Sequence, residues 1–258
     1  MTYQTITLDI ADDIAVIRLN RPEKYNALNG LMRAELTDAV RSSADKARVI
    51  VLTGNGPAFC SGQDLSDSGD VANPDLERTL RDEYQPLVRA LADSPIPTIA
   101  AVNGAAAGAG ANIALSCDVV IASESAYFLQ AFSRIGLIPD AAGTYWLPRS
   151  IGSPKAMGAA LFAEKISARD ADAWGMIWEA VEDDAFEKQW QSRAAYLAKG
   201  PTMAFRKIKE TLRGSWGETL EGQLDHEGKA QGACGQSRDF KEGVMSFIEK
   251  RPPHFEGR

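Results

Sequence analysis

The stretch from Pro97 to Ile121 constrains the fold more than any other part of the chain. It opens with an apolar run at 98–102, short enough for a buried strand. A helix is predicted at 109–116 and another strand at 118–122. The turn between strand and helix is crowded with alanine and with three glycines, Gly104, Gly108 and Gly110. Such a turn lets a group approach the backbone closely, and its open N–H groups can bind a phosphate or an oxygen that becomes negative during a reaction.

Hydrophobic patterning predicts alternating strands and helices over the first two-thirds of the chain and helices over the last third. Strands are expected within 3–20 (two, with a turn at 11–13) and at 48–53, 98–102, 118–122, 126–129 and 177–181. Helices are expected at 30–44, 75–93, 109–116, from within the turn at 136–143 toward 150, and at about 154–162, 167–174, 183–199, 201–213, 216–232 and 236–249. A loop is expected at 66–74. This alternation favours an α/β fold with parallel strands, and ligands of such sheets bind at the carboxyl ends of the strands.

Composition excludes several functions. The chain has 258 residues and a net charge of −7, which argues against nucleic-acid and membrane binding. Its three cysteines are scattered, as in a reduced, cytoplasmic protein with no metal site. Both histidines, His226 and His254, lie in the predicted helical tail, so a histidine-centred triad or zinc cluster is not expected. The expected division is a core at 1–198 and a helical region at 199–258.

Three glycine-rich turns follow predicted strands, and the third, at 136–143, carries Asp140. Two backbone N–H groups can stabilise the enolate that forms when a carbonyl compound loses an α-proton. A carboxylate in an apolar pocket can move that proton between carbons, because burial raises its pKa. From the residues alone, however, an aspartate after a proline at a helix start is more often an N-cap than a base.

Several motifs resemble the enoyl-CoA hydratase/isomerase (crotonase) superfamily over nearly the whole chain. They are Arg21-Pro22 with Asn26-Ala27-Leu28, the run 59–65 (FCSGQDL), 101–104 (AVNG) with 108–110 (GAG), Cys117-Asp118, and 136–139 (GLIP). The resemblance implies a crotonase-like stacked ββα spiral with a C-terminal helical trimerisation region. It also implies an acyl-CoA thioester as substrate, with coenzyme A as part of the substrate and no separate cofactor. Assembly into homotrimers, or hexamers made of two trimers, is implied as well.

The same resemblance implies roles for single residues. The backbone N–H groups of Gln63 and Ala109 would form the oxyanion hole, so their side chains could vary. Residues that would contact coenzyme A or the acyl group are Lys24, Ala27, Leu28, Ser61, Asp64, Leu65, Gly108, Asn112, Phe132 and Tyr145. Phe247 and Lys250 would reach coenzyme A from a neighbouring helix or subunit. Bland alternatives stay open: Asp64 would fix its own turn, Lys24 would be a solvated lysine, and the glycines would serve only helix packing.

Two departures from the family pattern bear on the reaction. Asn112 and Phe132 stand where a typical hydratase has its two water-activating glutamates, whereas Asp140 stands where double-bond isomerases of the family place a base. The closest resemblance is to the isomerases of phenylacetate degradation, which convert 1,2-epoxyphenylacetyl-CoA to oxepin-CoA and move Δ3 double bonds to Δ2. Ala142 replaces a glycine and Tyr145 a tryptophan that are common there. The alternatives are a hydratase-like lyase or thioesterase of the same fold, and a non-catalytic acyl-CoA-binding subunit.

Overall fold

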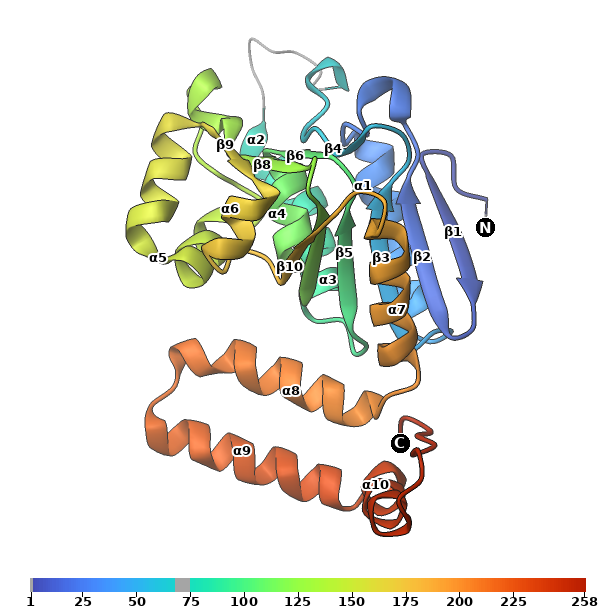
Figure 1. The fold of residues 1–258 in the computed structure, drawn as a ribbon. Helices are drawn as coiled ribbons and strands as arrows, with labels where there is room; N and C mark the ends of the chain where they lie inside the picture. The colour runs from blue at the N-terminus through green and yellow to red at the C-terminus, as the bar shows by residue number, and fades with distance from the viewer. Residues whose placement is uncertain (1, 68–74) are drawn as a thin grey trace.

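The computed structural model describes residues 2–67 and 75–258 (Figure 1). Most of the predicted loop at 66–74 lies outside the described residues. A six-stranded sheet has the order β1-β2-β3-β5-β7-β10. Its strands are β1 (Ile6–Ala11), β2 (Ile14–Leu19), β3 (Val49–Gly54), β5 (Thr98–Val102), β7 (Val119–Ser123) and β10 (Glu179–Val181). Within this sheet the β1–β2 pair is antiparallel and the other pairs are parallel. The two strands of this hairpin are joined through Asp12 and Asp13, both at positive φ, as in the turns that match strand twist.

A second sheet of four strands has the order β4-β6-β8-β9, and sequence patterning predicted only one of its members, β8. Its strands are β4 (Ala58–Cys60), β6 (Ala105–Ala107), β8 (Tyr127–Leu129) and β9 (Lys165–Ser167). Three-residue strands carry little periodicity, and an all-alanine strand has low β-propensity, so these segments could be expected only as turns. Each pair β3–β4, β5–β6 and β7–β8 gives one strand to each sheet and is followed by a helical segment.

Ten α-helices complete the described part of the chain, and most lie where hydrophobic patterning predicted them. They are α1 (Gly30–Ser43), α2 (Leu76–Thr79), α3 (Gln85–Ala92), α4 (Ala109–Ser116), α5 (Gly143–Phe162), α6 (Ala168–Ala173), α7 (Phe186–Ala198), α8 (Thr202–Gly214), α9 (Leu220–Gly235) and α10 (Arg238–Glu249). A π-helical segment, η3 (Leu80–Tyr84), joins α2 to α3 within the single helix predicted at 75–93. Pro86 follows it and lacks the N–H that a regular ladder needs. Helix α5 is kinked at Gly152, where φ is +73°.

The large sheet is covered on both faces, which is why its parallel strands read as continuous apolar runs. Alternate residues of β3 point to opposite sides: Ile50 and Leu52 belong to the main core, whereas Val49 and Val51 pack toward α7 and its Trp190. This arrangement leaves the carboxyl ends of β3 and β5, and the turns that follow them, at one end of the sheet.

Helices α8, α9 and α10 lie beyond the opposite end of the sheet, where α8 and α9 run side by side (Figure 1). Two cations of α8 anchor this region to the core: Lys209 Nζ lies 2.7 Å and Arg213 Nη2 2.9 Å from the carboxylate of Asp118. The same carboxylate accepts hydrogen bonds from the backbone N–H and the hydroxyl of Thr98 at the start of β5. None of the helices in the described residues is long and apolar enough to cross a membrane.

Candidate active site

A cavity of about 1280 Å³ lies where the glycine-rich turns meet. The turn after β4, the start of α4, the α2–η3–α3 segment and the chain from 131 to 146 all contribute to its wall. Eight of the predicted site residues line it: Gln63, Ala109, Asp140, Ser61, Leu65, Gly108, Phe132 and Tyr145. The convergence expected from three separate turns is therefore present in the fold.

The first two turns lie against each other because both contain a glycine that no other residue could replace without strain. Gly62 has φ +96° and Gly108 has φ +53°. A Cβ on Gly62 would lie 2.8 Å from the Ala107 carbonyl oxygen and 3.5 Å from the Ala109 nitrogen. The N–H groups of Gln63 and Ala109, each directly after its glycine, make no hydrogen bond to any residue of the described part of the chain. Two open backbone donors thus lie side by side at the cavity wall.

Asp140 lies in the third turn, and its carboxyl is largely buried. Its Oδ1 is sealed from solvent and has no hydrogen-bond partner within 2–67 and 75–258. Burial raises the pKa of this carboxyl to about 6. Helix α5 begins only at Gly143 with Ala142 as N-cap residue, and among the described residues no side chain caps it. The N-cap interpretation of Asp140 is therefore wrong: the Asp140 carbonyl, not its carboxylate, accepts the N–H of Gly143.

Asn112 does not line the cavity but holds the Asp140 turn from beneath. It is fully buried on α4, where its amide nitrogen donates to the Asp140 carbonyl oxygen over 2.8 Å and its Oδ1 accepts from Gln130. A Cβ on Gly143 would lie 2.3 Å from the Asn112 amide nitrogen, so the turn packs directly on this side chain. A glutamate at position 112 could not make the donated bond, because an ionised carboxylate is only an acceptor.

The remaining predicted site residues are distributed in two places. Lys24, Ala27, Leu28 and Asp64 lie in segments next to the first turn without lining the cavity: Leu28 pairs with Gln63, and Ser61 Oγ contacts the Lys24 carbonyl oxygen. Phe247 and Lys250 lie on and just after α10, away from this cavity in a single chain. Their contacts with coenzyme A stay a prediction.

Asp64 fixes its own turn, as the structural alternative to a role in substrate binding expected. Its carboxylate accepts the backbone N–H and the hydroxyl of Ser66 and pairs with Arg21 at 2.8 Å. The Ser66 bonds and the Arg21 guanidinium hold the pKa of this carboxyl below its usual range. The role of Asp64 is thus explained by local structure.

Sequence reasoning missed a polar cluster made of Arg33, Glu83 and Tyr84. Arg33 is 3% exposed although it is a cation on the apolar side of α1. Its Nη2 lies 2.5 Å from Glu83, and its guanidinium stacks over the Tyr84 ring. All three line the cavity, and burial raises the pKa of the Tyr84 hydroxyl, which keeps it neutral. The one signal in the sequence was the position of Arg33, which follows Met32 and shares the buried side of the helix with Leu36.

In the described residues no group of three or more histidine, cysteine, aspartate or glutamate side chains is placed to hold a metal ion. Among the polar groups that line the cavity are the N–H groups of Gln63 and Ala109, the Asp140 carboxyl and the Arg33 cluster.

Comparison with known proteins gives one consistent family. The family model for enoyl-CoA hydratase/isomerase matches residues 9–258. A Rhodobacter capsulatus protein named "probable enoyl-CoA hydratase" is 57% identical over the full length of both chains. The 1,2-epoxyphenylacetyl-CoA isomerase of Escherichia coli is 45% identical over 95% of each chain. The crystal structure of enoyl-CoA hydratase from Bacillus anthracis superimposes with a TM-score of 0.93 at 31% identity, covering 99% of this chain and all of that one. The crotonase-like α/β fold is confirmed, and the chain belongs to the enoyl-CoA hydratase/isomerase family.

Proposed function

We propose that this protein is an acyl-CoA isomerase that works through a thioester enolate. The Gln63 and Ala109 N–H groups would donate to the thioester oxygen, and Asp140 would move the proton. The observation that carries the proposal is the Asp140 carboxyl: it lines the same cavity as the two open amides, its Oδ1 has no partner in the described residues, and burial raises its pKa to about 6. A general base with that pKa is ionised at neutral pH and still readily returns a proton.

The proton balance of the step is simple for a 3-enoyl thioester. Ionised Asp140 takes a proton from the carbon next to the thioester, and the electron pair delocalises onto the thioester oxygen between the two N–H groups. The double bond shifts as the same carboxyl returns the proton to the γ-carbon, so nothing is gained or lost. Each backbone donor contributes about 3 kcal/mol of transition-state stabilisation in comparable sites.

A ring epoxide is the second substrate class within this proposal. The relative at 45% identity is named 1,2-epoxyphenylacetyl-CoA isomerase, and the cavity includes apolar and aromatic side chains that suit a ring, among them Phe132, Tyr145 and Trp146. An epoxide isomerisation conserves mass, as a double-bond shift does, and would use the same two amides.

Hydration is the second candidate function, and the relative at 57% identity favours it by its name. Syn addition of water to a 2-enoyl-CoA needs groups that activate the water. Asn112 bonds the Asp140 turn instead of facing the cavity, and Phe132 has no titratable group. Incubation with crotonyl-CoA tests this candidate, because hydration adds the mass of one water to the product and isomerisation adds nothing. Release of free coenzyme A would reveal a thioesterase.

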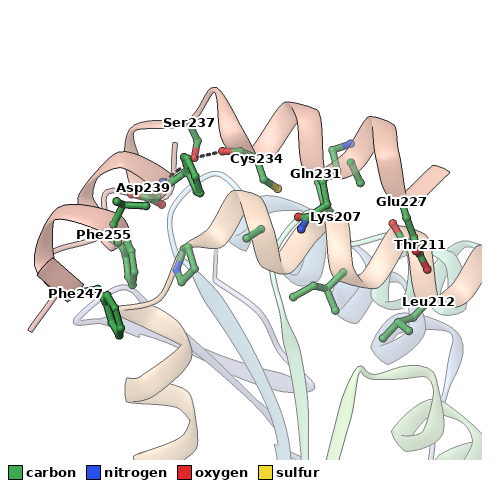
Figure 2. Close-up of a pocket in the computed structure, with 17 residues that line it drawn as sticks. Lys207, Thr211, Leu212, Glu227, Gln231, Cys234, Ser237, Asp239, Phe247 and Phe255 are labelled. Carbon is green, nitrogen blue, oxygen red and sulfur yellow. Dashed lines mark hydrogen bonds between the residues drawn. The ribbon is translucent and has the colours of Figure 1, made fainter. Parts of the chain in front are cut away.

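The helical region at 199–258 would assemble the protein into trimers or hexamers. Its three helices surround a groove of about 830 Å³ that is lined mostly by apolar side chains (Figure 2). Phe247, 85% exposed, is among the side chains that line it. Copies of the chain packed on α8–α10 would cover such residues and could bring Phe247 and Lys250 to a neighbour's coenzyme A.

The experiment that tests the proposal is turnover of cis-3-hexenoyl-CoA by Asp140→Asn, followed by the absorbance of the conjugated product. Loss of a general base typically lowers the rate by about 10²–10⁴-fold. Asp9→Asn, which makes the same change on exposed β1, serves as the control and keeps full turnover. Unchanged turnover in Asp140→Asn would remove Asp140 as the base. Tight acyl-CoA binding by the unaltered protein without any turnover would favour the non-catalytic binder.

A further inference from the structure

The side chain of Gln63 is held in one orientation by two donors. Its Oε1 lies 2.8 Å from Arg33 Nη1 and 2.5 Å from the Tyr84 hydroxyl. Arginine has no acceptor, so the atom that faces Arg33 must be the carbonyl oxygen of the amide. The buried Tyr84 hydroxyl is neutral, so it can donate the second bond. The carboxamide therefore cannot flip without breaking both bonds.

Arg33 is itself fixed. Its Nε and Nη2 donate to Glu83, and its Nη1 also donates to the carbonyl oxygen of Leu28. Leu28 brackets Gln63 on the backbone, since its N–H donates to the Gly62 carbonyl and its carbonyl accepts the N–H of Asp64. The backbone and the side chain of Gln63 are thus tied to one buried guanidinium.

The consequence concerns the other end of the carboxamide. With Oε1 occupied, Gln63 Nε2 carries two N–H groups that bond to no residue within 2–67 and 75–258, and this nitrogen is not sealed from solvent. Gln63 lines the cavity, on the same residue whose backbone N–H is one of the two proposed oxyanion donors. An amide donor that has no partner among the described residues, on a residue that lines a largely apolar cavity, favours a ligand that brings an acceptor.

We propose that the Gln63 side chain is a specificity-determining donor that binds an uncharged oxygen on the acyl group, near the thioester. The preferred substrates would then be acyl-CoA thioesters with an ether, epoxide or carbonyl oxygen close to the reacting carbons, rather than plain hydrocarbon chains. This inference rests on the proposed function for the position of the thioester, and it gives the Gln63 side chain a role of its own.

The test compares binding of unreactive acyl thioesters that differ by one oxygen. Hexanoyl-CoA, propoxyacetyl-CoA and 4-methoxybutanoyl-CoA have equal chain lengths, and the last two carry an ether oxygen at different positions. None has a double bond to move, so calorimetry measures Kd without turnover. The readout is the ratio of the Kd of hexanoyl-CoA to that of the better ether, which cancels any general weakening of binding.

Gln63→Glu keeps an acceptor for Arg33 and Tyr84 but loses the donor, and it is expected to lower this ratio about tenfold, the value of one good hydrogen bond. Gln63→Met removes donor and acceptor at similar length and should lower the ratio as well. Gln4→Glu, exposed near the N-terminus, makes the same change in net charge and leaves the ratio as it is. The inference would be overturned if the unaltered protein, Gln63→Glu and Gln63→Met gave Kd ratios that agree within twofold. Because binding does not need Asp140, failure here and failure of the isomerase proposal are separate results.

Discussion

The cavity at the glycine turns and the groove in the helical region differ in how their polar groups are placed. The cavity between the glycine turns holds the Arg33 cluster, a carboxyl oxygen of Asp140 and two backbone N–H groups, and neither that oxygen nor those N–H groups have a partner in the part of the chain that the structure describes. The groove between α8, α9 and α10 is lined mainly by apolar side chains, and the carboxylate of Asp239 in its wall is already bonded to the N–H groups of Glu256 and Gly257. Polar groups without a partner suit a substrate whose charge changes, whereas a mainly apolar lining suits a permanent neighbour.

The largest effect on stability is expected at Asn112, which is buried behind the wall of the cavity and bonds the Asp140 turn. Asn112→Asp would bury a carboxylate against the Asp140 carbonyl oxygen and remove the donated hydrogen bond, at a cost of about 3 kcal/mol in unfolding free energy. Urea unfolding measures it. Asn29→Asp is the matched control, because Asn29 only accepts the Met32 N–H as an N-cap and aspartate does the same. Equal, small losses in both variants would show that Asn112 does not hold the turn.

A substitution in the groove can disrupt the proposed contact between copies of the chain without changing the cavity. Leu212, on α8, is 64% exposed and lines the groove. If copies of the chain cover it, Leu212→Glu would cost about 2 kcal/mol for each covered carboxylate, and the assembly would dissociate on dilution. Light scattering against concentration measures this. Glu221→Gln, on the exposed start of α9, is the control. An unchanged mass for Leu212→Glu would place the interface elsewhere.

The pH dependence of turnover tests the cavity alone, because the groove contains no group of the proposed reaction. Because burial raises the pKa of Asp140 to about 6, its base form is lost as the pH falls through that value, and kcat/KM should drop about tenfold per pH unit below it. A profile that stays flat from pH 7 to pH 5 would argue against a base with this pKa.

The same raised pKa makes a prediction for stability. Unfolded Asp140 loses its proton near its ordinary pKa of 3.8, whereas the folded protein retains the proton up to about pH 6. Stability therefore falls as pH rises across this window, and Asp140→Asn, which cannot ionise, should be more stable than the unaltered protein at pH 7 by about 1 kcal/mol or more. Thermal unfolding at pH 4 and pH 7 checks it. A loss of stability at both pH values would mean that the carboxylate has a structural partner.

The smallest expected effect comes from the backbone of the Asp140 turn. Ala142 has φ +68°, a conformation that costs alanine about 1–2 kcal/mol and glycine almost nothing. Ala142→Gly should therefore stabilise the protein by about 0.5–1 kcal/mol, after the greater entropy of unfolded glycine is subtracted. Ala163, at φ +50° and not among the residues that line the cavity, is the comparison position, and Ala163→Gly should gain less because its methyl group is fully buried. A loss in Ala142→Gly alone would show that its methyl group packs against the turn.

Much of the fold, and the place of the candidate site, could be predicted from the sequence. The buried strand at 98–102 and the helix at 109–116 were predicted at their observed bounds, because continuous apolar runs broken by glycine are strong signals. The convergence of the three glycine turns followed from the rule for parallel sheets. Three of the four strands of the second sheet were missed, because three-residue strands carry little periodicity.

The missed parts of the cavity have a similar explanation. Arg33 lies on α1, whereas Glu83 and Tyr84 are neighbours on η3, and nothing in the sequence indicates that one buried guanidinium joins them to Gln63. Asn112 was expected, by a slight preference, to bond the acyl group or a loop rather than to be a plain polar residue on a helix, and the structure places it against the Asp140 loop. Which way a polar side chain on an apolar helix points depends on tertiary packing.

The central claim is that Asp140 moves a proton from C2 to C4 of the acyl group, and the most direct test follows that hydrogen atom with a deuterium label. Cis-3-hexenoyl-CoA carrying deuterium at C2 is converted in ordinary water under single-turnover conditions, and the position of the label in the product is read by mass spectrometry and NMR. If Asp140 moves the proton while the two backbone N–H groups hold the thioester oxygen, part of the label appears at C4 with the unaltered protein, and Asp140→Asn forms almost no product. A product hydroxylated at C3, or label transfer that persists in Asp140→Asn, would contradict the account.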